Sequence, residues 1–181
     1  ARLGDNEKAY ELFEALQAKL PNSIAARMAR AALKLVEDDD EGAVQLYQEI
    51  LELREDYAPA ANNLAWLIAE SDEPDLGEAL RLAMLAKNAY PDDSSISDTL
   101  GWVHLKRKSY SLAATQFELA LNGRPGDPTL SYHYALALHG DGQLQRAKEI
   151  LEPIIEKDVN FDEKDEMRAL YRELSEKSAS E

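Results

Sequence analysis

A small apolar residue and a bulky apolar residue recur together along the chain about every 34 residues. The small residue is alanine at five positions, with successive spacings of 34, 36, 34 and 34. An aromatic or aliphatic residue follows four places later in four of the five units, and a small or aliphatic residue comes three places after that. Offsets of 0, 4 and 7 lie on one face of an α-helix. The recurring alanines are Ala9, Ala43, Ala79, Ala113 and Ala147.

A second helix is predicted before most of these alanine helices. Its mark is a small residue in mid-helix, at Ala65, Gly101 and Ala135, with larger residues just before it and three places after it. A proline twelve residues after the repeat alanine, as at Pro91 and Pro125, cannot continue the helix and sets the exit turn. The pattern predicts helices near 5–20, 23–37, 40–54, 58–71, 76–90, 94–107, 110–123, 128–140, 143–157 and 161–177.

The predicted helices group into four full pairs, with a half unit before them and a single helix after them. The long spacing of 36 falls at residues 71–77 and predicts two extra residues in that turn. Because terminal units of repeat stacks normally carry a cap, the missing leading helix suggests a piece of a longer array. The units are 1–22 for the second helix of a truncated repeat, 23–56, 57–92 with the insertion, 93–126, 127–160, 161–177 for a C-terminal cap helix and 178–181 for a frayed tail.

Polar residues at the predicted helix starts support these ranges. Asp127, directly before a proline, is typical of an N-cap, and Ser109 is predicted to cap the next helix upstream. Asn160 with Glu163 is typical of a capping-box start for the last helix. The acidic run 38–41 is predicted to cap and solvate a turn, because it lacks the alternating acidic oxygens and central glycine of a calcium loop.

The repeating unit of small, bulky, small and proline positions resembles the tetratricopeptide repeat (TPR) family over nearly the whole chain. The resemblance implies an all-α fold: a right-handed superhelical solenoid of antiparallel helix pairs, with about ten helices here. The segments 62–67, 98–103 and 132–135 are also similar to large bacterial TPR proteins associated with exosortase and exopolysaccharide export. That narrower resemblance implies a role in a bacterial envelope assembly.

The resemblance also implies a binding groove, because the leading helices of TPR pairs line the concave face. Trp66 and Trp102 occupy the same place in successive repeats and with Tyr132 would form an aromatic strip; the alternative is that both tryptophans pack between repeats. Asparagine amides could pair with the backbone of an extended peptide. Asp98 and Glu70 favour a ligand with Lys or Arg, and the basic clamp for a C-terminal carboxylate is not matched. The groove candidates are Asn62, Asn63, Trp66, Asp98, Trp102, Tyr132 and His139.

Charge and composition narrow the classes of function. Thirty-five Asp and Glu against 20 Lys and Arg give a net charge of −15, which repels nucleic-acid phosphates and anionic lipid. The absence of cysteine removes disulfides, thiolate catalysis and thiolate metal sites. No run of about 18 apolar residues is present, so no membrane insertion is expected. The sequence leaves the compartment open between the periplasm or envelope and the cytoplasm.

Catalysis, cofactors and metals have little support in the sequence. The three histidines are His104, at a helix-packing position, and His133 and His139, which are six residues apart and so not on one helical face. No phosphate-binding, zinc-protease or serine-hydrolase motif occurs. We therefore expect a non-enzymatic scaffold without a cofactor, whose partner is another protein or peptide, extended and neutral to basic. The alternatives are a spacer or self-association module, or a regulatory appendage of a larger protein.

Overall fold

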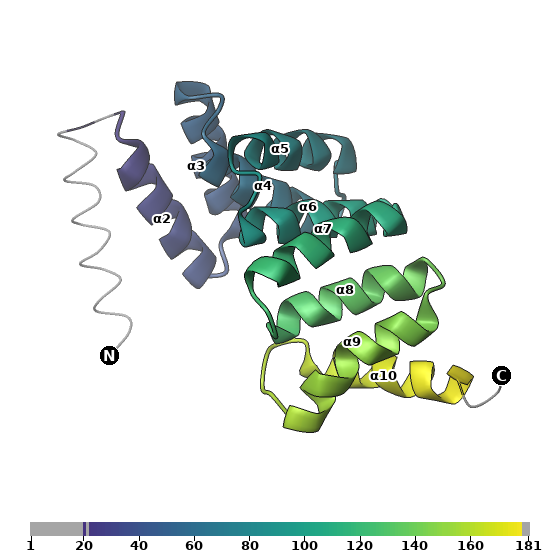
Figure 1. Ribbon diagram of the computed structural model, residues 1–181. Helices are drawn as coiled ribbons and strands as arrows, with labels where there is room; N and C mark the ends of the chain where they lie inside the picture. Colours follow the sequence, from purple (N-terminus) through teal and green to yellow (C-terminus); the bar gives the residue numbers. More distant parts are fainter. Residues whose placement is uncertain (1–19, 21, 179–181) are drawn as a thin grey trace, which may run out of the picture.

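The computed structural model describes residues 20 and 22–178, which form nine α-helices and contain no β-strand. The helices follow one another through short turns and are stacked in chain order from α2 to α10 (Figure 1). They are α2 (Ile24–Val36), α3 (Asp40–Leu53), α4 (Ala58–Glu70), α5 (Leu76–Ala89), α6 (Ser94–Lys106), α7 (Tyr110–Gly123), α8 (Pro128–Gly140), α9 (Leu144–Lys157) and α10 (Lys164–Ser178).

The all-helical fold predicted from the repeat is confirmed. The helix predicted at 5–20 lies outside the described residues, and the others occur close to their predicted ranges. The largest difference is the start of α10, at Lys164 instead of residue 161, so the predicted Asn160–Glu163 capping box was wrong. Ser109 does occupy the N-cap of α7, but its side chain makes no capping hydrogen bond. Asp127 and Asp39 accept such bonds from Leu130 and Gly42.

The helices form two layers that run the length of the stack. The leading helices α4, α6 and α8 contact one another in series and make the inner layer. The trailing helices α5, α7 and α9 each pack against the helix before and the helix after, which fixes every pair to the next. At the C-terminal end α10 packs on α9 in the place of a further leading helix, as Figure 1 shows. The inner layer therefore gathers residues that lie about one repeat apart in the sequence.

The repeat alanines lie in the buried core between packed helices. Ala43, Ala79, Ala113 and Ala147 are fully buried. In three of these units a buried bulky residue stands four places on, at Tyr47, Phe117 and Leu151. Phe117 packs against the backbone of Gly101, where a Cβ atom would stand 2.7 Å from Phe117 Cε1. Glycine is required at this position because only a hydrogen leaves room for the ring.

The cap helix α10 buries an apolar stripe and exposes a charged face. Met167, Leu170 and Leu174 are buried in the C-terminal half of the core. Arg168 and Arg172 are exposed, which is the amphipathic pattern of a helix that closes a stack. Within the described residues, every helix is too short or too polar to span a lipid bilayer.

Candidate functional site

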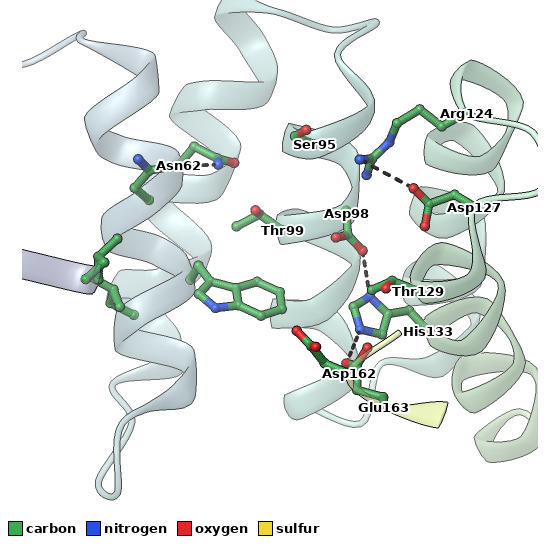
Figure 2. Close-up of a pocket in the computed structure, with 14 residues that line it drawn as sticks. Asn62, Ser95, Asp98, Thr99, Arg124, Asp127, Thr129, His133, Asp162 and Glu163 are labelled. Atoms are coloured by element: carbon green, nitrogen blue, oxygen red, sulfur yellow. Dashed lines mark hydrogen bonds and ion pairs between the residues drawn. The ribbon is translucent and has the colours of Figure 1, made fainter. Parts of the chain in front are cut away.

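The inner layer carries an open hollow of about 640 Å³ between α4, α6 and α8. Residues of the turns that precede α8 and α10 complete its lining. Figure 2 shows Asp98, His133, Asp162 and Glu163 converging on one side, with Asn62 on the other. Its lining residues are Leu35, Asn62, Asn63, Trp66, Leu67, Ser95, Asp98, Thr99, Arg124, Asp127, Thr129, His133, Asp162 and Glu163.

A buried histidine joins three helices at this hollow. His133 of α8 is 1% exposed; its Nδ1 lies 2.8 Å from Asp98 Oδ1 of α6, and its Nε2 lies 3.1 Å from Glu163 Oε1, directly before α10. A carboxylate oxygen only accepts hydrogen bonds, so both ring nitrogens must donate. His133 is therefore a doubly protonated, positively charged imidazolium in this arrangement (Figure 2).

The electrostatics of this cluster agree with its geometry. Burial lowers the pKa of His133, since it disfavours the charged ring. The hydrogen bonds to Asp98 and Glu163 and the two negative charges outweigh that effect and raise the pKa from 6.5 to about 9. The imidazolium is thus the stable form at neutral pH.

The two tryptophans stack on each other beside this histidine. The ring centroids of Trp66 and Trp102 are 5.3 Å apart, and the Trp102 centroid is 4.6 Å from that of His133. Trp66 lines the hollow, whereas Trp102 lies outside its lining. Trp102 Nε1 donates to Glu70 Oε1 at 2.5 Å, and Lys106 forms an ion pair with the same oxygen at 2.8 Å. Glu70 is thus already paired within the chain.

The two asparagines of α4 differ in what they do. Asn63 Nδ2 donates to the hydroxyl of buried Tyr47 at 3.0 Å, which ties α4 to α3. Asn62 Nδ2 makes only a long contact of 3.4 Å to Asn63 Oδ1, and Asn62 Oδ1 is buried without a hydrogen-bond partner among the described residues. Asn62 therefore lines the hollow with a side chain whose buried oxygen is unpaired among the described residues.

Besides Trp102, two more predicted groove residues do not line the hollow. Tyr132 is buried at 9% exposure, its pKa is raised by burial and by the charges of Glu163 and Glu166, and it does not line the hollow. His139 points to α10, where its Nε2 lies 3.3 Å from Glu173 Oε1. Side chains of α10 reach this part of α8: Glu173 contacts His139, and Tyr132 belongs to the same core cluster as Met167 and Leu170.

The sequence interpretation missed His133, Asp162 and Glu163 as members of this site. The spacing of His133 from His139 and the capping pattern of Glu163 do not predict this cluster. A signal was present: Asp98 and His133 are 35 residues apart, one residue more than a repeat, so the two charges fall on neighbouring leading helices. Asp162 and Glu163 could not be placed, because their position depends on where α10 starts.

The remaining candidates for chemistry are structural in this fold. His104 is partly buried, as predicted, and burial together with the charge of Arg107 lowers its pKa. Among residues 20 and 22–178, no group of three or more His, Asp or Glu side chains is placed to hold a metal ion. Asp127 caps α8 and lies 3.6 Å from Arg124, so that carboxylate is neutralised within the hollow (Figure 2).

The stacked helix pairs define a helical-repeat solenoid with a hollow on its inner layer. Solved structures show the same fold. One is a tetratricopeptide repeat protein from Parabacteroides merdae, with a TM-score of 0.72 and 15% identity over 98% of this chain and 68% of that one. PilF of Pseudomonas aeruginosa matches with a TM-score of 0.73 and 20% identity over 96% of this chain and 82% of that one. PilW, described as a widely conserved type IV pilus biogenesis factor, matches with a TM-score of 0.75 and 17% identity over 97% and 86%.

A further similar structure is MamA from Desulfovibrio magneticus RS-1, with a TM-score of 0.73 and 16% identity over 86% of each chain. Neither the family models nor the curated proteins give a match. The fold is thus that of a TPR protein, as the sequence predicted, while identities of 20% or less show the fold alone.

Proposed function

We propose that this chain is a polypeptide-binding scaffold whose ligand lies in the hollow of α4, α6 and α8. The observation that supports this most directly is the make-up of that hollow. A partly exposed indole, an asparagine amide and several carboxylates line one open space. Binding sites commonly combine an aromatic surface with a few polar groups that fix orientation.

The polar groups favour an extended ligand. Asn62, Ser95 and Thr129 come from three different helices and supply donors and acceptors along the hollow. An extended backbone has unpaired N–H and C=O groups, which such side chains can satisfy. A helical ligand would offer few of these groups, and a nucleic acid would meet repulsion from the carboxylates. The proposed partner is therefore an extended, neutral to basic segment of another protein.

We further propose that the partner belongs to a bacterial envelope assembly, such as an exopolysaccharide-export system. The support is the sequence resemblance to export-associated TPR proteins, together with the structural similarity to a type IV pilus biogenesis factor. The chain's role in such an assembly would be to position a partner without catalysing a reaction.

A selection experiment tests the binding function. Random 16-residue peptides displayed on phage are selected on the immobilised 181-residue chain and counter-selected on a Ser95→Lys variant. Ser95 is exposed and lines the hollow, so a lysine there should block it without disturbing the core. Thr115→Lys makes the same change on an exposed position of α7 outside the hollow and serves as the matched control.

The expected result is a set of peptides that bind the chain and the Thr115→Lys variant and lose affinity for Ser95→Lys. Bound peptide should also change the emission of Trp66, since that indole lines the hollow, and a Trp66→Phe variant assigns the signal. Peptides insensitive to Ser95→Lys would contradict the location of the site. A chain that selects no peptide and forms concentration-dependent oligomers in light scattering would support the self-association alternative.

A further inference from the structure

The hollow has more negative charge than its own cations neutralise. Its lining contains four carboxylates and two cations, His133 and Arg124, which leaves a formal excess of two negative charges. Arg124 pairs with Asp127, and His133 is shared by Asp98 and Glu163. Asp162 is exposed and makes no ion pair or hydrogen bond with the described residues. The unbalanced charge is therefore concentrated beside Asp162 and Glu163.

The carboxylates that hold His133 keep capacity for a second partner. Each uses one oxygen on the imidazolium, so Asp98 Oδ2 and Glu163 Oε2 have no hydrogen bond within the described part of the chain. Their side chains are 16% and 33% exposed. The buried imidazolium holds both carboxylates in fixed positions, which lowers the entropy lost when a second cation binds.

Trp66 adds a second, independent feature to the same space. Its indole lines the hollow and is only partly covered by the stacked Trp102. A cation over an indole is attracted by the negative face of the ring, most strongly where water is partly excluded. A planar guanidinium suits such a place better than an ammonium, because it can stack on the ring and still donate to carboxylates in its plane.

We propose that the hollow contains a subsite for one arginine side chain of the bound polypeptide, between the Trp66 indole and the carboxylates of Asp98, Asp162 and Glu163. This rests on the proposed function and specifies it. The guanidinium would donate to Asp162 and to the free oxygens of the other two carboxylates. The ligand is thus defined by an internal arginine, not by a chain end.

Binding at this subsite is coupled to His133. The arriving guanidinium and the imidazolium share Asp98 and Glu163, so each weakens the other's attraction to those carboxylates. By linkage, the bound arginine lowers the pKa of His133, and deprotonation of His133 tightens arginine binding. The other charged groups that line the hollow are Asp162 and the Asp127–Arg124 pair, and the pair is the same in every protein compared below.

The test uses the folded 181-residue chain and two matched small probes. N-acetylarginine methylamide is titrated against the ¹⁵N-labelled protein, and N-acetylcitrulline methylamide, a neutral near-isostere, serves as the control ligand. The signals followed are the Trp66 indole N–H and the His133 ring. We expect saturable shifts of both signals with arginine, and affinity for citrulline weaker by about tenfold or more.

Two variants separate a specific subsite from general acidity. Asp162→Asn should weaken arginine binding by about threefold to tenfold, the effect of one partly exposed ion pair. Asp165→Asn removes the same charge from a site outside the hollow and should change nothing. Equal effects of the two variants, equal affinity for the two probes, or a His133 pKa unchanged by saturating arginine would overturn the proposal.

The outcome is distinguishable from failure of the binding function itself. If selected peptides bind in the hollow but keep their affinity when each arginine is replaced by citrulline, the arginine subsite is wrong and the scaffold function stands. If the chain binds the arginine probe but selects no peptide, the scaffold function is wrong instead.

Discussion

His133 is the residue that links α6, α8 and the segment before α10. It is one of the few polar side chains fully buried in the described part of the chain, and it contacts α6 and the start of α10 from its place on α8. A buried charge is tolerated only when it is paired and hydrogen-bonded, and this one has two carboxylates. Its removal would leave Asp98 and Glu163 close together without a counter-charge.

The stability of the fold should therefore depend on the protonation of His133. The pKa is raised in the folded state to about 9 from 6.5, so the stabilisation is fully present below pH 6.5 and is lost as the pH rises through 9. Denaturant unfolding of the wild type and of His133→Gln should differ by roughly 3 kcal/mol at pH 6. We expect that difference to shrink steadily toward pH 10; a constant difference would show that His133 is not charged in the fold.

Gly101 is the second residue whose type is dictated by its neighbours. Gly101→Ala would place Cβ 2.7 Å from the ring of Phe117, which is fully buried and cannot move away freely. We expect a loss of about 1–3 kcal/mol in urea unfolding. Combining it with Phe117→Leu should recover part of that loss. If the two single effects simply add, the contact is not the cause.

Sequence reasoning worked for the residues that pack and failed for the buried ion cluster. The repeat alanines and Gly101 were identified because small size at a fixed period has one physical cause, the close approach of helices. His133 was missed because its environment is made by two other elements, one of which starts three residues later than expected. Two opposite charges about one repeat apart in the sequence indicate an ion pair between neighbouring leading helices. This prediction requires that the helix stacking be known first.

Three of the turns within the helix pairs share the same backbone conformation. After α2, α6 and α8 the chain takes a left-handed residue at Asp38, Lys108 and Gly142, with φ of 58°, 59° and 78°. In each case the next residue donates to the carbonyl five residues earlier, as in Ser109 to His104 and Gln143 to Leu138. This is the hydrogen bond of a Schellman C-cap, which favours glycine at the left-handed position.

Exchanging residues between two of these turns tests that interpretation. Lys108→Gly should stabilise the chain by about 0.5–1 kcal/mol, because it relieves the left-handed lysine. Gly142→Lys should destabilise it by a similar amount, since Gly142 has the same conformation and nothing lies within 4 Å of its added Cβ. Thermal unfolding of both variants measures the effect, and a destabilising Lys108→Gly would show that the turn has another requirement.

The turn between α4 and α5 departs from this rule. It spans residues 71–75, whereas 107–109 join α6 to α7, so the C-cap is replaced by an extended Ser71 and a start capped by Asp75. The sequence located the longer turn from the spacing of 36 between Ala43 and Ala79. The described α-helices could be predicted because apolar residues recur with a clear helical spacing. The start of α10 could not, because it depends on tertiary contacts of the loop before it.

At the scale of the whole molecule the fold is a stack in which each helix contacts only near neighbours. The apolar core consists of two clusters of buried residues, an N-terminal one from α2 to α6 and a C-terminal one from α7 to α10, and Trp102 packs against both. Such stacks are stabilised by the sum of neighbouring interfaces, so loss of a terminal element acts locally first. The stack also creates the hollow, since no single repeat holds its walls.

Removing the cap helix should therefore loosen the C-terminal half selectively. A chain ending at residue 160 loses Met167, Leu170 and Leu174 from the core and Glu163 from His133. In hydrogen exchange we expect the amides of α8 and α9 to lose protection by about tenfold or more, with α4 and α5 changed far less. Uniform loss along the chain would mean that the stack unfolds as one unit.

The central claim is that the hollow of α4, α6 and α8 holds an extended polypeptide, and one calorimetric comparison tests it most directly. The dissociation constant of the strongest library-selected peptide is measured for the wild type, Ser95→Lys and Thr115→Lys. The account predicts a loss of about tenfold or more for Ser95→Lys, from steric and charge repulsion at the hollow, and wild-type affinity for Thr115→Lys. Equal affinity for all three proteins would contradict it.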